Sequence, residues 1–440
     1  MSNNELNLME KIVSLAKRRG FVFPGSEIYG GLANSWDYGP VGVELKNNIK
    51  QLWWKRFVQE RPDMVGLDAA LVMNTKVWQA SGHLDTFSDP LVECKKCHAR
   101  FREDKIDVTA PCQNCKAKDN FTTPKQFNLM LKTFLGPAEE EANIAYFRPE
   151  TAQAIFVQFK NVLDTTRKQI PFGIAQIGKA FRNEITPGNF VFRTREFEQM
   201  EIEYFAKEEN WQEQFEHWQE QINYWLANDL QIDAKNINEL NVPKEELAHY
   251  SKRTIDFEYQ FPFGLDELYG LAYRTDHDLK AHQEASGQSL EYTDPHSGEK
   301  FIPHVIEPSM GVDRTFLALL LEHYHEDQVE DKQRVWLSLP AKLAPYKAAV
   351  FPLLKNKPEL VAKAKEVYAQ LSKYFNVDYD ERGNVGKRYF SQDEIGTPYC
   401  ITIDFDTLED DTVTIRDRDT MQQERVKIEE LIELISQKLI

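Results

Sequence analysis

The chain has 440 residues, of which 42% are apolar, so it can form two or three domains with hydrophobic cores. No run approaches the ~20 apolar residues of a membrane-spanning helix, and the charged N-terminus is not that of a signal peptide, so we expect a cytoplasmic protein without membrane segments. The net charge of −17 disfavours a general nucleic-acid binder, although it is compatible with local basic surfaces.

The N-terminal segment predicts two helices. Residues 6–19 follow an amphipathic pattern, and residues 43–59 carry an apolar stripe at helical spacing. The intervening residues 20–42 are rich in Gly, Pro and aromatic residues, which indicates a rigid loop. A strand is expected at residues 65–73. The stripe of the second helix consists of Leu45, Ile49, Leu52, Trp53 and Phe57.

Cysteines form the most specific motif of the next segment. Cys94-x-x-Cys97 and Cys112-x-x-Cys115 are separated by 14 residues. Each pair can hold Zn²⁺ through two thiolates at ~2.3 Å, and two pairs complete a closed tetrahedral site, so we expect a structural zinc knuckle at about residues 92–120. Four thiolates leave no open position for catalysis. Disulfides are the competing interpretation, which a reducing compartment disfavours.

Basic residues gather within this knuckle. Seven Lys or Arg residues stand against three acidic residues between Cys94 and Lys118. The knuckle therefore either contacts RNA or is a solvated insertion, and the sequence does not separate these two interpretations. Cys400 stands alone in the strand-like run 399–403 and is expected to be a core residue.

An antiparallel hairpin is predicted from residues 172–182 and 192–205, with turn residues at 186–189. Period-two alternation gives the second arm an apolar face and a face that carries carboxylates. A core strand rarely carries such polar residues unless that face lines a ligand cavity, so we expect a cavity here. The apolar face is Met200, Ile202 and Tyr204, and the polar face is Phe197, Gln199, Glu201 and Glu203.

A helical insertion is expected at about residues 206–252. Its aromatic and apolar residues recur at spacings of four and three, which places them on one helical face. A tryptophan stripe of this kind indicates a core or docking face rather than a cofactor site. Strands are expected at 254–259 and 267–272, with Glu267 at the mouth of the second. The stripe is Trp211, Phe215, Trp218, Ile222 and Trp225.

A strand–turn–helix motif follows at residues 303–321. We expect the strand to end at Pro308, Ser309 to cap the helix, and Gly311 to permit close backbone approach. Arg314 is a lone cation among the apolar residues of this helix. An arginine that extends its charge to the surface is the alternative to a ligand contact.

The last part of the chain, from residue 335, predicts a small α/β domain around a mixed sheet. Strands are expected at 347–354, 385–390, 399–405 and 412–418, and helices at 359–373 and 423–438.

Three of these segments together resemble the motifs of class II aminoacyl-tRNA synthetases. The helix and strand at 43–73 are similar to motif 1, which builds the dimer interface in that family. The hairpin is similar to motif 2, whose arginine, here Arg182, holds the α-phosphate of ATP while an aromatic residue stacks on adenine. The 303–321 segment is similar to motif 3, whose arginine, here Arg314, holds the γ-phosphate. No GxxxxGK[ST] loop occurs, which argues against a P-loop ATPase.

Three carboxylates indicate which of the class II synthetases the chain resembles. Glu150, in Arg-Pro-Glu-Thr-Ala-Gln, joins Glu201 and Glu307 on three different motifs. Acids that converge on one cavity repel one another unless a cation lies among them, and an α-ammonium group is such a cation. With Arg-Glu-Phe-Glu-Gln-Met-Glu and Glu-Pro-Ser-x-Gly, the chain from about residue 8 onward is similar to the homodimeric glycyl-tRNA synthetase family.

This resemblance implies that the three acids hold the glycine ammonium, that Ser309 blocks larger side chains, and that Arg102 contacts substrate. It also implies tRNA-Gly as a substrate, Mg²⁺ with ATP, Glu267 as a metal or phosphate-side ligand, and a homodimer. The implied ATP site is Arg182, Asn183, Glu184, Phe192, Arg193, Thr194, Arg195, Glu196, Phe197, Glu267, Leu268, Gly311, Val312, Asp313 and Arg314. The implied glycine site is Arg102, Glu150, Phe197, Glu198, Gln199, Met200, Glu201, Glu307, Pro308, Ser309, Met310 and Gly311.

The expected fold class is α/β (α+β), with a class II antiparallel-sheet catalytic domain at 1–334, interrupted by the zinc-knuckle and helical insertions, and an anticodon-binding domain at 335–440. Two alternatives stay open. One is another class II synthetase with the same C-terminal domain, which the three-acid pocket and the lack of a long editing domain disfavour. The other is a catalytically inactive, synthetase-like RNA-binding protein, which the presence of Arg182 and Arg314 disfavours.

Overall fold

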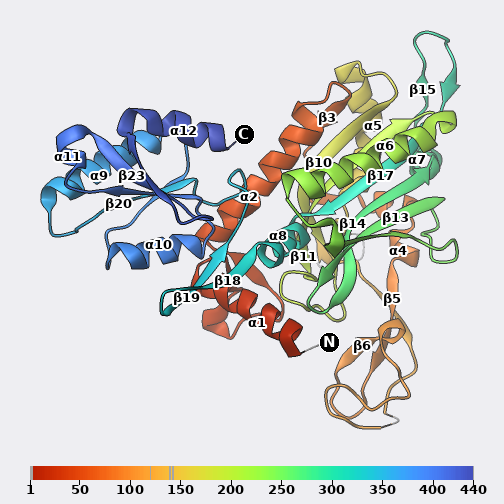
Figure 1. The fold of residues 1–440 in the computed structure, drawn as a ribbon. Helices are drawn as coiled ribbons and strands as arrows, with labels where there is room; N and C mark the ends of the chain where they lie inside the picture. Colours follow the sequence, from red (N-terminus) through yellow and green to blue (C-terminus); the bar gives the residue numbers. More distant parts are fainter. Residues whose placement is uncertain (1–2, 119, 138–139, 141–142, 440) are drawn as a thin grey trace.

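The computed structural model describes residues 3–118, 120–137, 140 and 143–439. Residues 1–2 and 440, at the ends of the expected domains, and residue 119, in the expected knuckle, lie outside the described residues. Figure 1 shows a large part built around an antiparallel sheet and a smaller C-terminal α/β part, drawn in blue, which confirms the expected fold class. None of the described helices is long and apolar enough to cross a membrane.

Both predicted N-terminal helices are confirmed, as α1 (Asn3–Arg18) and α2 (Pro40–Trp54). α2 begins earlier than expected because proline fits the first turn of a helix, and it continues as a π-helical turn over Lys55–Gln59. The glycine-rich link between them contains a hairpin of β1 (Val22–Pro24) and β2 (Trp36–Tyr38). The predicted stripe of α2 is buried or half-buried.

A seven-stranded sheet forms the centre of the large part, in the order β12-β13-β14-β17-β11-β10-β3. Neighbouring strands are antiparallel, except that β10 and β3 are parallel. The predicted hairpin is the pair β10 and β11. The strands are β3 (Met64–Gly66), β10 (Phe172–Phe181), β11 (Glu196–Ala206), β12 (Ile237–Asn241), β13 (Arg253–Phe261), β14 (Gly264–Thr275) and β17 (His304–Gly311).

Helices cover both faces of this sheet. The apolar face of β11 packs with α2, α6 (Trp211–Tyr224) and α8 (Val312–Glu322) in the main core, so the tryptophan stripe of α6 is a core face, as predicted. The opposite face, which carries Glu201 and Glu203, packs in part against α5 (Ala152–Thr166) and α7 (His277–Ser286). The remainder of that face is open, and the cavities described below lie there.

The strand expected at 65–73 is wrong as a single element. The chain leaves the central sheet after Gly66, and β4 (Val72–Met73) pairs instead with β9 (Ile144–Phe147), which also pairs with β8 (Lys132–Phe134). This change of sheet brings the segment before Glu150 next to the central strands.

The expected end of the motif 3 strand is also wrong. β17 continues past Pro308 to Gly311, which is the residue that precedes α8, so Ser309 does not cap the helix. Ser309 is instead paired with Glu201 on one side and Gly270 on the other. Pro308 is tolerated inside the sheet because the ladder between β17 and β11 is interrupted at this point.

The cysteine-containing segment projects from the large part (Figure 1). It is built on a three-stranded sheet in the order β6-β5-β7, and short helices and a small hairpin complete the large part. These elements are α3 (Thr75–Ala80), α4 (His83–Thr86), β5 (Ser88–Glu93), β6 (Arg100–Arg102), β7 (Lys125–Asn128), β15 (Tyr292–Thr293) and β16 (Lys300–Phe301).

The C-terminal part is a five-stranded mixed sheet in the order β21-β20-β22-β23-β24 with flanking helices. Cys400 is buried on β22, as predicted. The strands are β20 (Ala348–Pro352), β21 (Val377–Tyr379), β22 (Tyr399–Ile403), β23 (Thr412–Asp417) and β24 (Gln423–Lys427). The helices are α9 (Pro358–Leu371), α10 (Val385–Asp393), α11 (Thr407–Asp410) and α12 (Leu431–Lys438).

Two predictions in this part are wrong. The strand expected at 385–390 is helix α10, because the Asn384 side chain accepts a hydrogen bond from the backbone N–H of Lys387 at 2.9 Å and caps the first turn. The helix expected at 423–438 begins later, because residues 423–427 form β24, where Val426 pairs with Val413 of β23.

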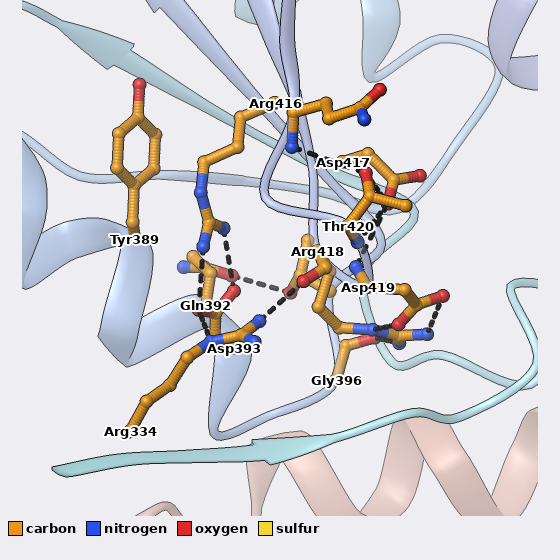
Figure 2. A network of polar contacts seen from close by, with 12 residues as sticks. Arg334, Tyr389, Gln392, Asp393, Gly396, Arg416, Asp417, Arg418, Asp419 and Thr420 are labelled. Carbon is orange, nitrogen blue, oxygen red and sulfur yellow. Dashed lines mark hydrogen bonds and ion pairs between the residues drawn. The ribbon is translucent and has the colours of Figure 1, made fainter. Parts of the chain in front are cut away.

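A buried ionic junction joins the two parts, as Figure 2 shows. It begins on the hairpin of β18 (Tyr324–Val329) and β19 (Lys332–Leu337), within which the expected domain boundary after residue 334 falls. Arg334 donates from Nε to Asp393 at 2.8 Å, and Arg416 donates two hydrogen bonds to the same carboxylate at 2.8 and 3.0 Å.

Candidate active site

Two adjoining cavities open on the polar face of the central sheet. The first has a volume of about 340 Å³ and is lined by arginines and aromatic residues; we call it the arginine cavity. The second has a volume of about 290 Å³ and is lined by carboxylates; we call it the acid cavity. Four residues line both cavities, so the two spaces meet at a common wall. These residues are Arg182, Gln199, Glu267 and Ser309.

Arg182 stands at this common wall, immediately after β10. Its Nε donates to the carbonyl of Pro149 at 3.0 Å, which fixes the side chain. The guanidinium carbon lies 5.4 Å from the ring centre of Phe87 and 5.2 Å from that of Phe197. Two aromatic contacts and one backbone contact thus hold the guanidinium at the wall of both cavities.

Arg314 enters the arginine cavity from the first turn of α8. Its Nη1 donates to the backbone carbonyl of Glu267 at 2.6 Å and to the Glu267 carboxylate at 3.2 Å. The guanidinium carbon lies 4.4 Å from the ring centre of Phe192. Arg314 therefore lines the arginine cavity, as Arg182 does, instead of extending away from the site.

Most residues of the ATP-binding site that the resemblance implies line the arginine cavity, but four do not. Val312 is buried in the main core, Arg195 donates to the carbonyls of Ala33 and Glu184, and Glu196 pairs with Lys179 outside the cavity. Asn183 contacts Leu129 through its backbone. The residues that do line it are Arg182, Glu184, Phe192, Arg193, Thr194, Phe197, Glu267, Leu268, Gly311, Asp313 and Arg314.

Asp313 lines this cavity but is already engaged. Its carboxylate accepts from the Lys46 ammonium at 2.8 Å, from the backbone N–H of Glu198 at 2.7 Å and from the Tyr38 hydroxyl. These contacts tie the start of α8 to α2 and β11. Asp313 therefore orients the helix that carries Arg314.

The three predicted carboxylates converge in the acid cavity. Glu150 lies just before α5, Glu201 on β11 and Glu307 on β17, and their exposed fractions are 9%, 2% and 7%. Glu201 and Glu307 approach because their strands are neighbours in the sheet. Alternation on the second hairpin arm predicted that Glu201 faces a cavity, and the three motifs led us to expect Glu150 and Glu307 beside it.

Glu201 has the most donors. The backbone N–H of Thr151 donates to it at 3.1 Å, the hydroxyl of Ser309 at 2.9 Å and the amide of Gln199 at 3.2 Å, while the Thr151 hydroxyl also donates. Burial raises the pKa of Glu201 and the charge of Glu150 adds to that rise, whereas the hydroxyl donors oppose it.

A buried arginine that the sequence did not reveal lies beside the acids. Arg274 donates from Nη1 to Glu307 at 2.9 Å and from Nε and Nη2 to Asp278 at 2.8 and 2.9 Å. Burial raises the pKa of Glu307 to about 8, because Arg274 only partly opposes burial and Glu201 and Glu150 raise it further. The lining of the cavity thus contains two arginines, Arg182 and Arg274, and an excess of carboxylates.

Glu150 has a different environment. The His83 Nε2 lies 3.4 Å from its carboxylate, and the amide of Gln153 donates to it at 3.0 Å. Burial favours the neutral form, but His83, Arg274 and Gln153 outweigh it and hold the pKa of Glu150 well below its usual range. The environment of Glu150 therefore favours its ionised form. His83, like Arg274, was not predicted, because it belongs to a short helix without a recognisable motif.

The residues of the glycine-binding site that the resemblance implies lie in three places. Met200 and Met310 lie in the main core and Pro308 is a buried strand residue, so none of them lines either cavity. The residues in the acid cavity are Glu150, Gln199, Glu201, Glu307 and Ser309. Those in the arginine cavity are Arg102, Phe197, Glu198, Gln199, Ser309 and Gly311.

The Arg-Pro-Glu-Thr-Ala-Gln motif also builds the wall of the site. Arg148 is almost fully buried and donates to the carbonyls of Lys179 and Ala69 and to the Gln176 side chain, at 2.7, 3.0 and 2.9 Å. A side chain at Gly178 would place its Cβ only 2.1 Å from the Arg148 guanidinium, so glycine is required there. Arg148 thus fixes the segment that presents Glu150.

The four cysteines of the knuckle form a compact cluster. Their sulfur atoms all lie within 4.8 Å of one another, with 3.6 Å between Cys94 and Cys115 and 3.8 Å between Cys97 and Cys112. Four ligands at ~2.3 Å from a tetrahedral zinc would be ~3.8 Å apart, so the cluster fits Zn²⁺.

Arg102 connects the knuckle to the arginine cavity. It lies on β6, lines that cavity, and pairs with Asp89 at 2.9 Å and Asp104 at 2.8 Å. Its position therefore depends on the three-stranded sheet that also presents Cys94.

Comparison with known proteins agrees with these findings. The family model described as "tRNA synthetase class II core domain (G, H, P, S and T)" matches residues 137–324, and "Anticodon binding domain" matches residues 347–438. The glycine–tRNA ligases of Clostridium acetobutylicum, Alkaliphilus oremlandii and Clostridium tetani are each 55% identical to this chain, and each comparison covers 98% of both chains.

Proposed function

This chain belongs to the glycine–tRNA ligase family of class II synthetases, and from that premise we propose how its two cavities divide the reaction. The enzyme activates glycine with ATP to glycyl-adenylate and diphosphate, and then transfers glycine to the 3′ end of tRNA-Gly. The observation that carries the proposal is that Arg182 lines both cavities. ATP occupies the arginine cavity, glycine occupies the acid cavity, and their reacting atoms meet beside Arg182.

The arginine cavity suits a bent triphosphate. Arg182 lies beside the α-phosphate and Arg314 beside the γ-phosphate, and Phe192 and Phe197 offer aromatic surfaces for adenine. The glycine carboxylate attacks the α-phosphorus, the bond to the β-phosphate oxygen breaks, and diphosphate leaves. Because the nucleophile is already ionised, the site needs positioning and charge neutralisation rather than a general base.

Mg²⁺ accompanies ATP in this class, and the donor set of the cavity can accept it. Glu267 is a carboxylate on the common wall of the two cavities, and oxygen ligands of this kind suit Mg²⁺. The ion would supply positive charge to the leaving diphosphate. Arg314, which donates to Glu267, holds that carboxylate in place.

The acid cavity suits an ammonium group. Glu150, Glu201 and Glu307 provide the negative charge, and a cation among them would relieve their repulsion. Ser309 donates to Glu201 from a central strand, so its position is rigid, and we assign it the role of blocking side chains larger than that of glycine. Glycine has no smaller competitor, so exclusion by size suffices without editing.

Glycine-dependent exchange between ATP and diphosphate tests this division. Glycine should support exchange, whereas alanine and serine should not. Exchange that alanine stimulates equally would contradict the proposed exclusion. The same assay with the remaining amino acids would detect any other class II specificity.

The remaining assignments follow the family. Residues 1–334 are assigned to catalysis and 335–440 to anticodon binding, and the cysteine cluster to one structural Zn²⁺. A reducing cytoplasm, where thiolates persist, is the proposed location. Local basic residues of the knuckle are available to tRNA despite the negative net charge.

A homodimer is proposed from the segment that precedes α2. Ile28, Tyr29 and Leu32 have exposed fractions of 88%, 87% and 64%, which is unusual for large apolar side chains so close together. A second copy of the chain would cover them, next to the helix that resembles motif 1. Replacing Ile28 and Tyr29 with Asp should shift the mass in light scattering from dimer to monomer, and a monomeric wild-type protein would contradict the assignment.

A further inference from the structure

Glu203 is a fully buried carboxylate to which the proposed reaction assigns no role. It follows Glu201 by two positions on β11 and therefore faces the same side of the sheet. One oxygen from each of Glu201, Glu203 and Glu307 lies within 4.8 Å of the other two. Glu203 is absent from the lining of the acid cavity, so it lies behind the two carboxylates that form the wall.

Both carboxylate oxygens of Glu203 are buried and have no hydrogen-bond partner among the described residues. The nearby donors are used elsewhere. Thr151, Gln199 and Ser309 donate to Glu201, and Arg274 donates to Glu307 and Asp278. An ionised carboxylate without donors in such a place is strongly disfavoured.

The surrounding charges favour the same state. Burial raises the pKa of Glu203 well above its usual value, and the charge of Glu307 from β17 adds to this. Arg274 from β14 opposes the rise, but three of its five N–H donors are used by Glu307 and Asp278, and Glu201 on β11 and Asp278 from α7 add further negative charge. A carboxylic acid has one O–H donor, so a protonated Glu203 can itself donate to a neighbouring carboxylate.

We propose that Glu203 is a positioning residue that stays a neutral carboxylic acid and directs its O–H toward Glu307, which fixes that carboxylate toward the glycine ammonium. The inference rests on the proposed glycine site and adds its support from behind. It also explains how a fourth glutamate fits here without adding another negative charge. A divalent ion bound by the three glutamates is the competing interpretation, although Arg274 already supplies a cation to Glu307.

Two uncharged variants of similar size separate hydrogen bonding from shape. Glu203→Gln keeps a donor, and Glu203→Leu does not. In glycine-dependent exchange we expect the KM for glycine to rise at least ~10-fold in Glu203→Leu and no more than ~3-fold in Glu203→Gln, with the KM for ATP little changed in both. Equal KM values for glycine in the two variants would overturn the proposal, because shape alone would then explain Glu203.

Infrared difference spectra provide a second readout that needs no activity. At pH 7, the wild-type minus Glu203→Gln spectrum should contain the C=O stretch of a protonated carboxyl group. A carboxylate band in its place would show that Glu203 is ionised, whether alone or on a metal, and would overturn the proposal. This measurement decides the matter even if Glu203→Leu does not fold.

Glu201→Gln distinguishes failure of this inference from failure of the glycine site. Glu201 lines the acid cavity, so its loss should raise the KM for glycine ~10²-fold. An unchanged KM in Glu201→Gln would show that glycine does not bind there, and the support assigned to Glu203 would fall with that site. A strong effect in Glu201→Gln together with an ionised Glu203 would overturn only the present inference.

Discussion

Two buried clusters of this protein hold unequal numbers of positive and negative groups, in opposite senses. The acid cavity gathers glutamates around Arg274, with an excess of negative groups. The junction in Figure 2 gathers arginines around Asp393, which is fully buried, with an excess of positive groups. The arginines are Arg334, Arg416 and Arg418, whose exposed fractions are 1%, 4% and 3%.

What neutralises the excess differs between them. At the junction, Arg334 also pairs with the partly exposed Asp327, and Arg418 pairs with Asp419. Other guanidinium donors reach backbone carbonyls, as when Arg418 donates to that of Gly396 at 2.6 Å. Carboxylates can only accept, and strand N–H groups are already used in the sheet. The negative excess is therefore left beside a cavity of about 290 Å³. An excess of charge that protein groups neutralise stabilises the fold, whereas an excess of charge left beside a cavity indicates a ligand site.

The largest expected effect comes from disrupting the buried junction around Asp393. Asp393→Ala leaves the guanidiniums of Arg334 and Arg416 without their shared carboxylate and should lower the free energy of unfolding by ~3–5 kcal/mol. Exchange activity per folded molecule should change less than twofold. Urea unfolding monitored by tryptophan fluorescence measures the effect. Asp419→Ala is the matched control, because Asp419 pairs with Arg418 but its side chain is 52% exposed, so it should cost less than ~1 kcal/mol.

Replacing the arginines that line the arginine cavity should instead lower activity and leave stability almost unchanged. Arg182→Ala and Arg314→Ala each remove one charge that stabilises the transition state and should lower kcat/KM for activation ~10²–10³-fold, with the free energy of unfolding changed by less than ~1 kcal/mol. Near-normal exchange in either variant would contradict its phosphate role. A large loss of stability would contradict the distinction between the cavities and the buried junction.

The sequence predicted the acid cavity better than the buried junction around Asp393. Glu201 was assigned to a cavity because strand alternation fixes which side chains share a face, and this requires no knowledge of the partner. Arg274 was missed because it meets Glu307 only through the pairing of β14 with β17, and Asp278 joins the cluster only through Arg274. Their sequence carries no motif that distinguishes them from surface residues.

The wrong secondary-structure predictions have the same origin. Ser309 follows a proline and can cap a helix, but pairing with β11 and β14 extends the strand through it. Residues 423–427 could continue into a helix, but β23 offers them an open edge. Tertiary pairing decided both cases against local propensity. The junction around Asp393 joins strands, helix and turn from distant positions, so no local pattern predicts it.

The third prediction tests the excess in the acid cavity by titration. With its pKa raised to about 8, Glu307 is largely protonated at pH 7 in the glycine-free enzyme, and ammonium binding must release that proton. The KM for glycine should therefore rise as pH falls below about 8, by at most ~10-fold per pH unit. Without glycine, stability should fall as pH rises from Glu307's unfolded-state pKa toward about 8, because the folded state then holds the extra proton.

One neighbour must be separated from this effect. Asp256 lines the same cavity, and burial raises its pKa to about 7. Measurements of the KM for glycine from pH 6.5 to 8.5 should give the same profile in Asp256→Asn as in the wild-type enzyme. A profile that disappears in Asp256→Asn would assign the titration to Asp256, and a flat wild-type profile would contradict a protonated Glu307.

The smallest expected effect concerns the cysteine cluster, which becomes a third group of like charges when its thiols ionise to bind a metal. A bound cation should balance it, so the protein should contain one Zn²⁺ per chain. Replacing Cys112 and Cys115 with Ser should remove the metal and expose residues ~90–120 to proteolysis. Because β6 also carries Arg102 to the arginine cavity, the KM for glycine or tRNA should rise a few-fold, while the core unfolds at the same temperature.

Disulfides would instead give no metal and no free thiol beyond Cys400 under denaturing, chelating conditions. Elemental analysis with a thiol count separates the two, and less than about half an equivalent of zinc in protein purified without chelator would contradict this site.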